Sequence, residues 1–244
     1  MKIILLTGSA GSIGSEIIKN LSKKNKIICV DKNLKELIKL KKKFNKVDIY
    51  KCELHKEAQV EKLIKIIKNK YKKIDILINN VGKISNEPII KIGKKGLVSH
   101  SYKKWNEIIN ANLNSVFLIS SKIIKVLCSS RSKGLIINIS SVSAKGNIGQ
   151  SGYSSAKAAV EILTKIWAEE LKSFGIRVAC IAPGFFNTES TKRALNRNQL
   201  IHLKRVTPSN RLGRPIEIIS AIKFLIQNDF FNGKILNLDG GLNL

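Results

Sequence analysis

Seven short runs of apolar residues recur along the chain, and each is continuous rather than alternating with polar positions. Such runs are typical of strands buried on both faces of a parallel sheet, because neither face meets water. We therefore predict seven strands, at residues 2–7, 26–30, 47–50, 75–79, 134–140, 176–182 and 234–238.

Between these runs, apolar residues recur every three or four positions, as in EAQVEKLIKIIKNKY at residues 57–71. This spacing places the apolar side chains on one face of a helix. Strands that alternate with helices to the end of the chain predict an α/β fold, a doubly wound (Rossmann) parallel seven-stranded sheet with helices on both faces. No linker rich in Pro, Gly or Ser divides the chain, so we expect a single domain over residues 1–244.

Two segments are too long for ordinary connections between a strand and a helix. Residues 83–104 follow the fourth predicted strand, and residues 183–210 follow the sixth. Both leave the carboxyl ends of strands, the edge at which open α/β sheets bind ligands. Long excursions there are commonly lids or binding loops. We expect an inserted loop at 83–104 and a substrate lid at 183–210.

The formal charge of +27 changes this picture little. Only seven of the 44 basic residues are arginines, and the lysines are spread over the whole chain. Surfaces that read nucleic-acid bases usually depend on the arginine fork, so we expect no specific nucleic-acid partner. Abundant Lys, Ile and Asn are typical of an AT-rich genome. Nonspecific binding of polyanions at low salt stays open as a side effect.

Cysteine and histidine usage indicates a cytoplasmic protein without a metal. The three histidines, His55, His100 and His202, lack metal-ligand spacing. The first apolar run is too short for a signal peptide, and no stretch of about twenty uncharged apolar residues predicts a membrane span. The cysteines lie far apart without a C-x-x-C pair, which favours reduced, buried thiols: Cys29, Cys52, Cys128 and Cys180.

The first predicted strand runs into TGSAGSIGSEIIKNL, a glycine-rich turn that opens an amphipathic helix. Such a turn lets the backbone approach a pyrophosphate, and the helix N-terminus supplies N–H groups. Asp31 ends the second predicted strand, where a carboxylate accepts both ribose hydroxyls of NAD and repels the extra phosphate of NADP. We expect NAD(H) to be preferred. Capping of the next helix is the alternative role for Asp31, and Lys32 leaves NADP(H) open.

A tyrosine and a lysine four residues apart, Tyr153 and Lys157, share one face of a predicted helix. In a chain this rich in lysine the pair could arise by chance, so its weight depends on its surroundings. The chemistry is suitable. Free tyrosine has a pKa of about 10, and a neighbouring ammonium favours the phenolate and lowers that pKa. The pair could therefore act as an acid–base group near neutral pH.

The surroundings form an ordered series that spans nearly the whole chain. In chain order these are TGSAGSIG, NNVG, NANL, NISS, YSSAK, APGFFNT, RLGRPIEI and LDGG. This series resembles the short-chain dehydrogenase/reductase family, in its single-domain branch. In motif detail it is most similar to the 3-oxoacyl-(acyl carrier protein) reductases. Tyr153 is the one tyrosine that stands where that family needs it.

The chain departs from the family pattern at three positions. Ser12 stands where the single-domain glycine pattern has glycine, and Gly11 instead gives the spacing of longer relatives. Glu53 replaces the adenine-contacting aspartate, and Val81 replaces the alanine of N-N-A-G. These changes bear on the turn geometry and on the space for the cofactor more than on the function.

The resemblance implies a role for each matching residue. Tyr153 would be the proton donor in reduction, with Lys157 tuning it and binding the nicotinamide ribose. Ser141 would hydrogen-bond the substrate oxygen, and Asn112 would hold a water that links Lys157 to solvent. The cofactor would contact Tyr153 and Lys157 together with Gly8, Gly11, Ser12, Ile13, Gly14, Asp31, Glu53, Leu54, Asn80, Val81, Gly82, Pro183, Gly184, Phe186 and Thr188.

The function this resemblance implies is an NAD(P)(H)-dependent oxidoreductase that interconverts a ketone and a secondary alcohol, with acyl carrier protein as a candidate carrier of the substrate. The length of segment 83–104 keeps a second hypothesis open, a dehydrogenase acting on a sugar or sugar nucleotide. A third, of another class, is a polyanion-binding or cofactor-sensing protein without turnover. The family also implies a homotetramer, with a dimer as the fallback.

Overall fold

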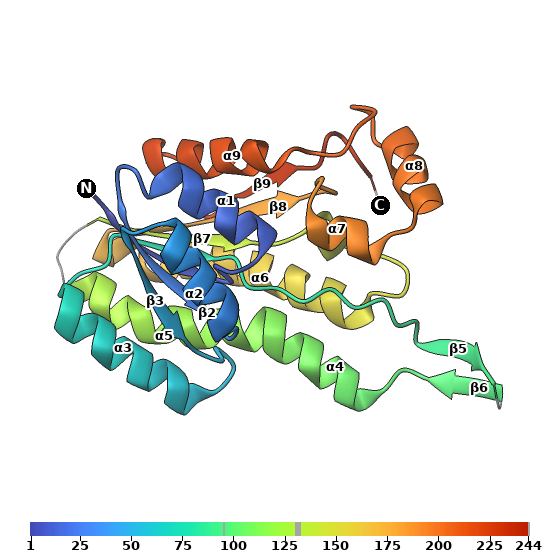
Figure 1. The fold of residues 1–244 in the computed structure, drawn as a ribbon, viewed down its shortest axis with the longest axis horizontal. Coiled ribbons are helices and arrows are strands. Elements are labelled where there is room, and N and C mark those ends of the chain that lie inside the picture. The colour runs from blue at the N-terminus through green and yellow to red at the C-terminus, as the bar shows by residue number, and fades with distance from the viewer. Residues whose placement is uncertain (95, 130–132, 244) are drawn as a thin grey trace.

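The computed structural model describes residues 1–94, 96–129 and 133–243. Within these residues, seven parallel strands form one sheet in the order β3-β2-β1-β4-β7-β8-β9 (Figure 1). The strands are β1 (Ile3–Thr7), β2 (Lys26–Asp31), β3 (Val47–Lys51), β4 (Ile76–Asn79), β7 (Gly134–Ile139), β8 (Ile176–Pro183) and β9 (Ile235–Leu238). Each predicted strand is confirmed, with its ends correct to about one residue, and so is the doubly wound fold.

Helices cover both faces of this sheet. The first layer holds α1 (Ser12–Leu21), α2 (Leu34–Lys43) and α9 (Pro215–Gln227), and the second holds α3 (Glu57–Tyr71), α5 (Ser115–Ser129) and α6 (Ser151–Glu170). The remaining helical pieces are α4 (Tyr102–Ile109), the π-turn η1 (Asn110–Asn114), the 3₁₀ turns η2 (Val142–Lys145) and η3 (Lys172–Phe174), α7 (Glu189–Ala194) and α8 (Arg197–Val206).

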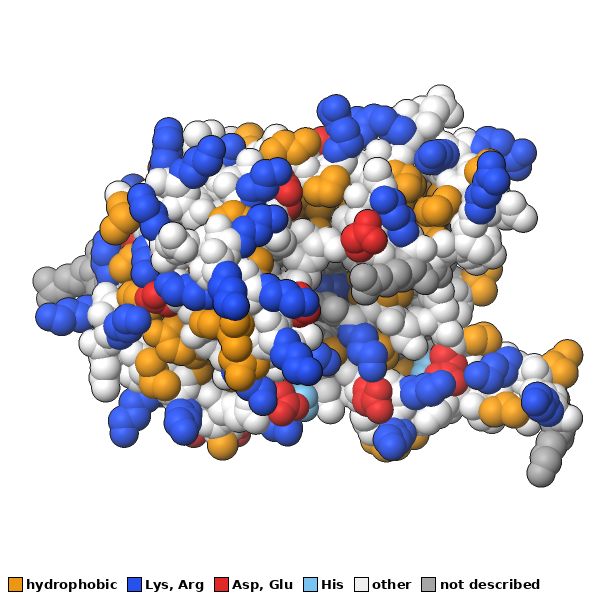
Figure 2. Space-filling model, in the orientation of Figure 1, with side chains coloured by type: hydrophobic (Ala, Val, Ile, Leu, Met, Phe, Trp, Pro, Cys, Tyr) orange, Lys and Arg blue, Asp and Glu red, His pale blue; other side chains and the backbone are white. Residues whose placement is uncertain are grey.

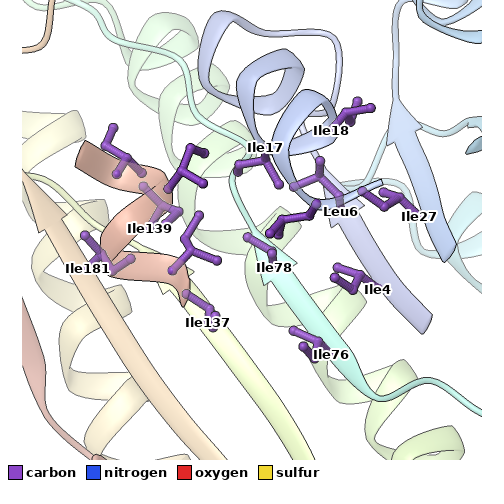
Figure 3. Close-up of a cluster of buried hydrophobic side chains, with 14 of the residues drawn as sticks. Ile4, Leu6, Ile17, Ile18, Ile27, Ile76, Ile78, Ile137, Ile139 and Ile181 are labelled. Atoms are coloured by element: carbon purple, nitrogen blue, oxygen red, sulfur yellow. The ribbon is translucent and has the colours of Figure 1, made fainter. Parts of the chain in front are cut away.

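Alternate residues of one strand enter different halves of the core. Ile4 and Leu6 of β1 join the cluster beneath α1 and α9, which Figure 3 shows, whereas Leu5 joins the cluster beneath α3 and α5. All three side chains are fully buried. Successive side chains of a strand point to opposite faces, so a sheet covered on both sides requires the continuous apolar runs seen in the sequence.

The two long segments both have structure of their own. Residues 83–104 contain an antiparallel hairpin, β5 (Ile90–Gly93) and β6 (Gly96–Ser99), which projects away from the sheet (Figure 1). The sequence predicted only a loop here. Segment 183–210 carries α7 and α8, which lie across from the hairpin in the same view.

By length and composition alone, one helical stretch of the described residues, Tyr102–Cys128, could cross a membrane. In the fold, 44% of its most apolar window is buried. Val116, Ile119 and Ile123 of this stretch belong to the core against the sheet. Burial within a folded domain accounts for their apolar character, and the absence of a membrane span stays a prediction.

Candidate active site

A cavity of about 1000 Å³ opens at the carboxyl ends of β1, β4, β7 and β8. Figure 2 shows the hollow near the centre of the molecule. Two of the candidate residues, Gly14 and Asn112, do not line it. Those that do are Gly8, Gly11, Ser12, Ile13, Asp31, Glu53, Leu54, Asn80, Val81, Gly82, Ser141, Tyr153, Lys157, Pro183, Gly184, Phe186 and Thr188.

The turn after β1 depends on two glycines. Gly8 has φ +59°, a left-handed conformation that glycine adopts without steric cost. A Cβ on Gly14 would lie 2.5 Å from the carbonyl oxygen of Gly8, so α1 can pack this closely only with glycine there. Gly11 is the N-cap of α1, with an extended backbone at φ −75°, and Ser12 is the first helical residue. Serine at position 12 is therefore compatible with the turn.

The carboxylate of Asp31 contacts the same turn. It accepts hydrogen bonds from the backbone N–H groups of Ala10, at 3.1 Å, and Asn33, at 3.0 Å. The helix cap is a different residue, because Asn33 is the N-cap of α2 and its side chain accepts from the N–H of Glu36. Capping of α2 is thus excluded as the role of Asp31, which faces the cavity.

The structure brings the tyrosine, the lysine and the serine together. Tyr153 and Lys157 lie one turn apart on α6, with the Lys157 Nζ 5.8 Å from the centre of the Tyr153 ring. The Ser141 hydroxyl, just past β7, lies near the Tyr153 phenol and acts to lower its pKa. Nζ of Lys157 donates to the carbonyl of Ile139 at 2.8 Å. The three functional groups therefore share one wall of the cavity.

The pKa of Tyr153 differs from the expectation. Burial raises it above the ordinary value, and the Ser141 hydroxyl only partly offsets this effect. Burial also lowers the pKa of Lys157 to about 8. The predicted lowering of the tyrosine pKa by the ammonium is wrong for the protein by itself. Desolvation of the phenol sets the direction of the shift, and the Lys157 ammonium donates to the backbone carbonyl of Ile139 rather than to the phenol oxygen.

Asn112 lies behind this wall and is fully buried. It belongs to the π-turn η1, a local irregularity that is frequent at functional sites. Its Nδ2 donates to the carbonyls of Ile108 and Lys83, and its Oδ1 accepts from the Lys83 N–H. A Cβ on Gly82 would lie 3.2 Å from the Asn112 Oδ1 and 3.5 Å from the Lys157 Nζ. Glycine at 82 thus keeps space between these two groups.

The remaining candidates line the two ends of the cavity. At one end, a hydrogen bond from Lys56 to the partly exposed carboxylate of Glu53 lowers the pKa of that carboxyl. At the other, a Cβ on Gly184 would lie 2.8 Å from the Asp239 Cα, so the backbone after β8 is closely packed. Thr188 caps α7 by accepting from the N–H of Thr191.

The sequence did not predict two contacts of the site, both made by the Ser140 hydroxyl. The Ser140 hydroxyl lies 2.8 Å from a carboxylate oxygen of Glu161 and 3.1 Å from the carbonyl oxygen of Lys157, and its single proton is shared between these two acceptors. This pair joins the end of β7 to α6, and thereby sets the position of Ser141 relative to Tyr153. Glu161 lies four residues after Lys157, a spacing that shares a helix face. The sequence could not show that Ser140 would meet that face.

The site fits a nicotinamide dinucleotide. Glycines at 8, 14 and 82 leave room where a Cβ would collide with backbone or functional groups. A helix N-terminus and an acidic residue at the end of the second strand lie at one end of the cavity. A buried tyrosine that can carry a proton lies on its wall. Together, these features define a dinucleotide-dependent oxidoreductase of the α/β class.

The family follows from comparison with known proteins. Residues 2–199 match the family model of the short chain dehydrogenases, and the chain belongs to this family. The FabG 3-oxoacyl-[acyl-carrier-protein] reductase of Thermotoga maritima is 32% identical over 249 residues, covering 99% of this chain and 97% of the relative. The Vibrio harveyi FabG is 37% identical over 186 residues, covering 75% and 72%.

Among solved structures, 4-hydroxyisoleucine dehydrogenase complexed with NADH is similar, with a TM-score of 0.89 and 30% identity, over 99% of this chain and 98% of that one. The protein is thus an NAD(P)-dependent oxidoreductase that interconverts a ketone and a secondary alcohol, as the motifs predicted. This result removes the hypothesis of a polyanion-binding or cofactor-sensing protein without turnover. The hypothesis of a sugar dehydrogenase gains no support over a reductase of the FabG kind.

Proposed function

We propose that the protein reduces 3-oxoacyl thioesters, with acyl carrier protein as the carrier of the acyl chain. The observation that carries this proposal is the Ser141–Tyr153–Lys157 cluster on the cavity wall. The FabG relatives, whose names give this reaction, cover nearly all of the chain and support the choice of substrate.

Each residue of the cluster has a chemical task. The bound cofactor supplies the hydride, and the proton for the substrate oxygen comes from the Tyr153 phenol. Since burial raises the pKa of Tyr153, the phenol is protonated at neutral pH, as a proton donor for reduction must be. Ser141 donates a hydrogen bond to the substrate oxygen as negative charge develops there. Lys157 stabilises the phenolate left behind, and Asn112 holds a water for proton resupply.

For the cofactor, we propose a preference for NAD(H), with NADP(H) as a weaker substitute. Asp31 supports this, since its carboxylate faces the cavity at the end of β2, where a 2′-phosphate would meet negative charge. Lys32 and Asn33 line the same end of the cavity. The ratio of kcat/KM for NADH to that for NADPH measures the preference, and a ratio below one would contradict it.

The surrounding elements have proposed roles as well. The chain would act as one domain over residues 1–244, with 183–210 as the lid over the substrate and the start of 83–104, at Lys83 and Ile84, as a wall of its pocket. We propose a homotetramer, or failing that a dimer, that works in the cytoplasm without a membrane or a specific nucleic acid. The four cysteines, all in described residues, are free thiols, which is consistent with a reducing compartment.

The test is the turnover of a 3-oxoacyl N-acetylcysteamine thioester by the wild type and by Tyr153→Phe. Loss of the phenolic proton should lower kcat by about 10²-fold to 10⁴-fold, the range for general acid catalysis. Tyr102→Phe is the matched control, because Tyr102 is exposed on α4. Activity of Tyr153→Phe equal to that of the wild type, or a wild type inactive on the thioester, would refute the proposed function.

A further inference from the structure

We call residues 83–104 the arm. Its β5–β6 hairpin presents one apolar face to solvent. Ile92 of β5 lies directly opposite Leu97 of β6 in the antiparallel register, and directly opposed residues share a face. Ile90 lies on the same face, two residues before Ile92. Ile92 is 87% exposed and Leu97 is 72% exposed. No other described element therefore covers this face.

An apolar face this exposed is expected to bind another molecule. A two-stranded hairpin is at best marginally stable in water by itself, and a contiguous exposed apolar patch usually marks an interaction surface. Within the described residues, β5 and β6 pair only with each other, and the exposure of Ile92 and Leu97 shows that no second layer covers this face. A partner that covers Ile90, Ile92 and Leu97 would complete the missing layer.

The base of the arm is firmly attached beside the active site. Glu87 is buried, its carboxylate pairs with Lys91 at 3.3 Å and Lys104 at 3.2 Å, and its N–H donates to the carbonyl of Gly149 at 2.6 Å. Burial opposes ionisation of Glu87, but the bonds from Lys104 and Lys91 hold its pKa below the usual range. The loop containing Gly149 leads directly into α6, which carries the catalytic tyrosine.

The same base forms part of the cavity. Lys83 and Ile84, at the start of the arm, line the cavity together with Gln150, whose Nε2 donates to the side chain of Asn86 at 2.7 Å. The arm then extends outward on the side of the molecule where α7 and α8 lie (Figure 1). A partner bound to the apolar face would therefore sit next to the entrance of the substrate end.

Charge indicates which partner fits. Residues 83–104 contain six lysines and one glutamate, a formal charge of +5, within a chain of +27. At the arm itself, the equally basic arm of a second copy is repelled, whereas an acidic protein is attracted and steered to it. An apolar centre with a basic rim is complementary to an amphipathic helix that carries acidic residues at its edges.

We propose that the arm is the docking surface for an acidic carrier protein that delivers the thioester to the cavity. This inference rests on the proposed function, and it names the surface of this chain that the carrier would contact. The apolar face of Ile90, Ile92 and Leu97 contacts the carrier helix, and Lys94 lies at the turn between the strands as part of the basic rim.

The first test measures binding of fluorescently labelled holo-acyl carrier protein by anisotropy, without turnover. The double variant Ile92→Ser/Leu97→Ser removes the apolar centre and should weaken binding by about tenfold or more, as loss of an interface centre does. The control is Phe230→Ser, since Phe230 is 98% exposed and lies beyond α9, outside the arm. Equal affinity of the arm variant and the wild type would overturn the proposal.

The second test addresses charge. Lys94→Glu should weaken carrier binding severalfold and reduce its dependence on salt, because one attractive charge becomes repulsive. Lys223→Glu on α9 is the matched control, since it makes the same change of net charge on an exposed position outside the arm. Equal losses of affinity in both variants would show that only the overall charge matters, and would overturn the assignment to the arm.

Turnover assays distinguish a failure of the docking proposal from a failure of the proposed function. With the N-acetylcysteamine thioester, which has no carrier, the Ile92→Ser/Leu97→Ser variant should keep kcat and KM within about twofold of the wild type, and KM for the carrier-bound substrate should rise. A wild type inactive on both substrates refutes the proposed function, while the binding assay still decides on the arm. A smaller particle mass of the variant in sedimentation, with unchanged carrier binding, would assign the arm to a second copy instead.

Discussion

Burial determines the protonation of the two central side chains, Tyr153 and Lys157. Both are more than nine-tenths buried, and burial shifts each toward its neutral form: the pKa of the phenol rises and that of the ammonium falls to about 8. A neutral phenol is the form that donates a proton. The free protein is thus set up for reduction, and oxidation would first require removal of that proton.

The lowered pKa of Lys157 has a consequence for stability. Between pH 8 and the ordinary lysine value of 10.5, the unfolded chain binds a proton that the folded protein does not. The free energy of unfolding therefore rises with pH across this window, by roughly 3 kcal/mol in total. Below pH 8, where Lys157 is charged in the folded protein, its burial destabilises the fold most.

Replacing this lysine tests the shift directly. We expect the Lys157→Met protein to lack this rise in unfolding free energy. Between pH 7.5 and 10.5 the wild type should therefore gain stability relative to the variant. Urea unfolding at both pH values measures it, with Lys165→Met, an exposed lysine on the same helix, as the control. A difference that does not change with pH would show that Lys157 is not desolvated.

At the scale of the element, α1 and α6 position the two halves of the site. The N-terminus of α1 faces the cavity only because Gly14 lets the helix approach the Gly8 turn. α6 carries Tyr153 and Lys157, the residues proposed for proton transfer, and is fastened to β7 by the Ser140–Glu161 contact. The two helices pack on opposite faces of the sheet, so the cavity lies between elements that the sheet itself holds in place.

The close approach of α1 predicts a large effect from a single methyl group. Gly14→Ala should destabilise the protein by about 1–3 kcal/mol, because its Cβ would lie 2.5 Å from the Gly8 oxygen and 2.6 Å from the Ser9 oxygen. Gly152→Ala is the control, a glycine near the N-terminus of α6 whose added Cβ meets nothing closer than 3.4 Å. Urea midpoints compare the two, and a Gly14 variant as stable as the Gly152 variant would contradict this reading of α1.

At the scale of the whole molecule, positive charge is spread over the visible face rather than gathered in one patch (Figure 2). This distribution matches a bias of composition better than a nucleic-acid surface. Apolar side chains are exposed on the outer sides of two helices, Phe117 on α5 and Ile166 on α6. Such positions, on the layer that covers the sheet, suit contact between subunits.

The proposed oligomer can be tested at these positions. In the Phe117→Asp/Ile166→Asp protein, two charges would be buried without partners in the interface, and a smaller particle should result. Sedimentation velocity measures the mass, and Phe230→Asp, which places the same charge at an exposed site in the α9–β9 connection, should leave the wild-type mass unchanged. A monomeric wild type would contradict the proposed assembly.

Local patterns were enough to predict the strands and the grouping of three polar residues at the site. The seven apolar runs became the seven strands of the parallel sheet, because burial on both faces leaves no alternating pattern. The ordered motifs named Ser141, Tyr153 and Lys157, and these residues lie together. The arm was missed as a hairpin, since the run from Ile89 to Ile92 looks the same in sequence whether it is covered or exposed.

What the amino-acid sequence by itself determined was the order of elements, the class of fold and the choice of residues proposed for catalysis, because these depend on periodicity and on residue type. Only the tertiary structure decided the direction of the Tyr153 pKa, the contact of Ser140 with Glu161 and the exposed face of the arm. Each of these depends on which groups meet across the fold and on how much water they lose, and desolvation and long-range contact are properties of the packed chain.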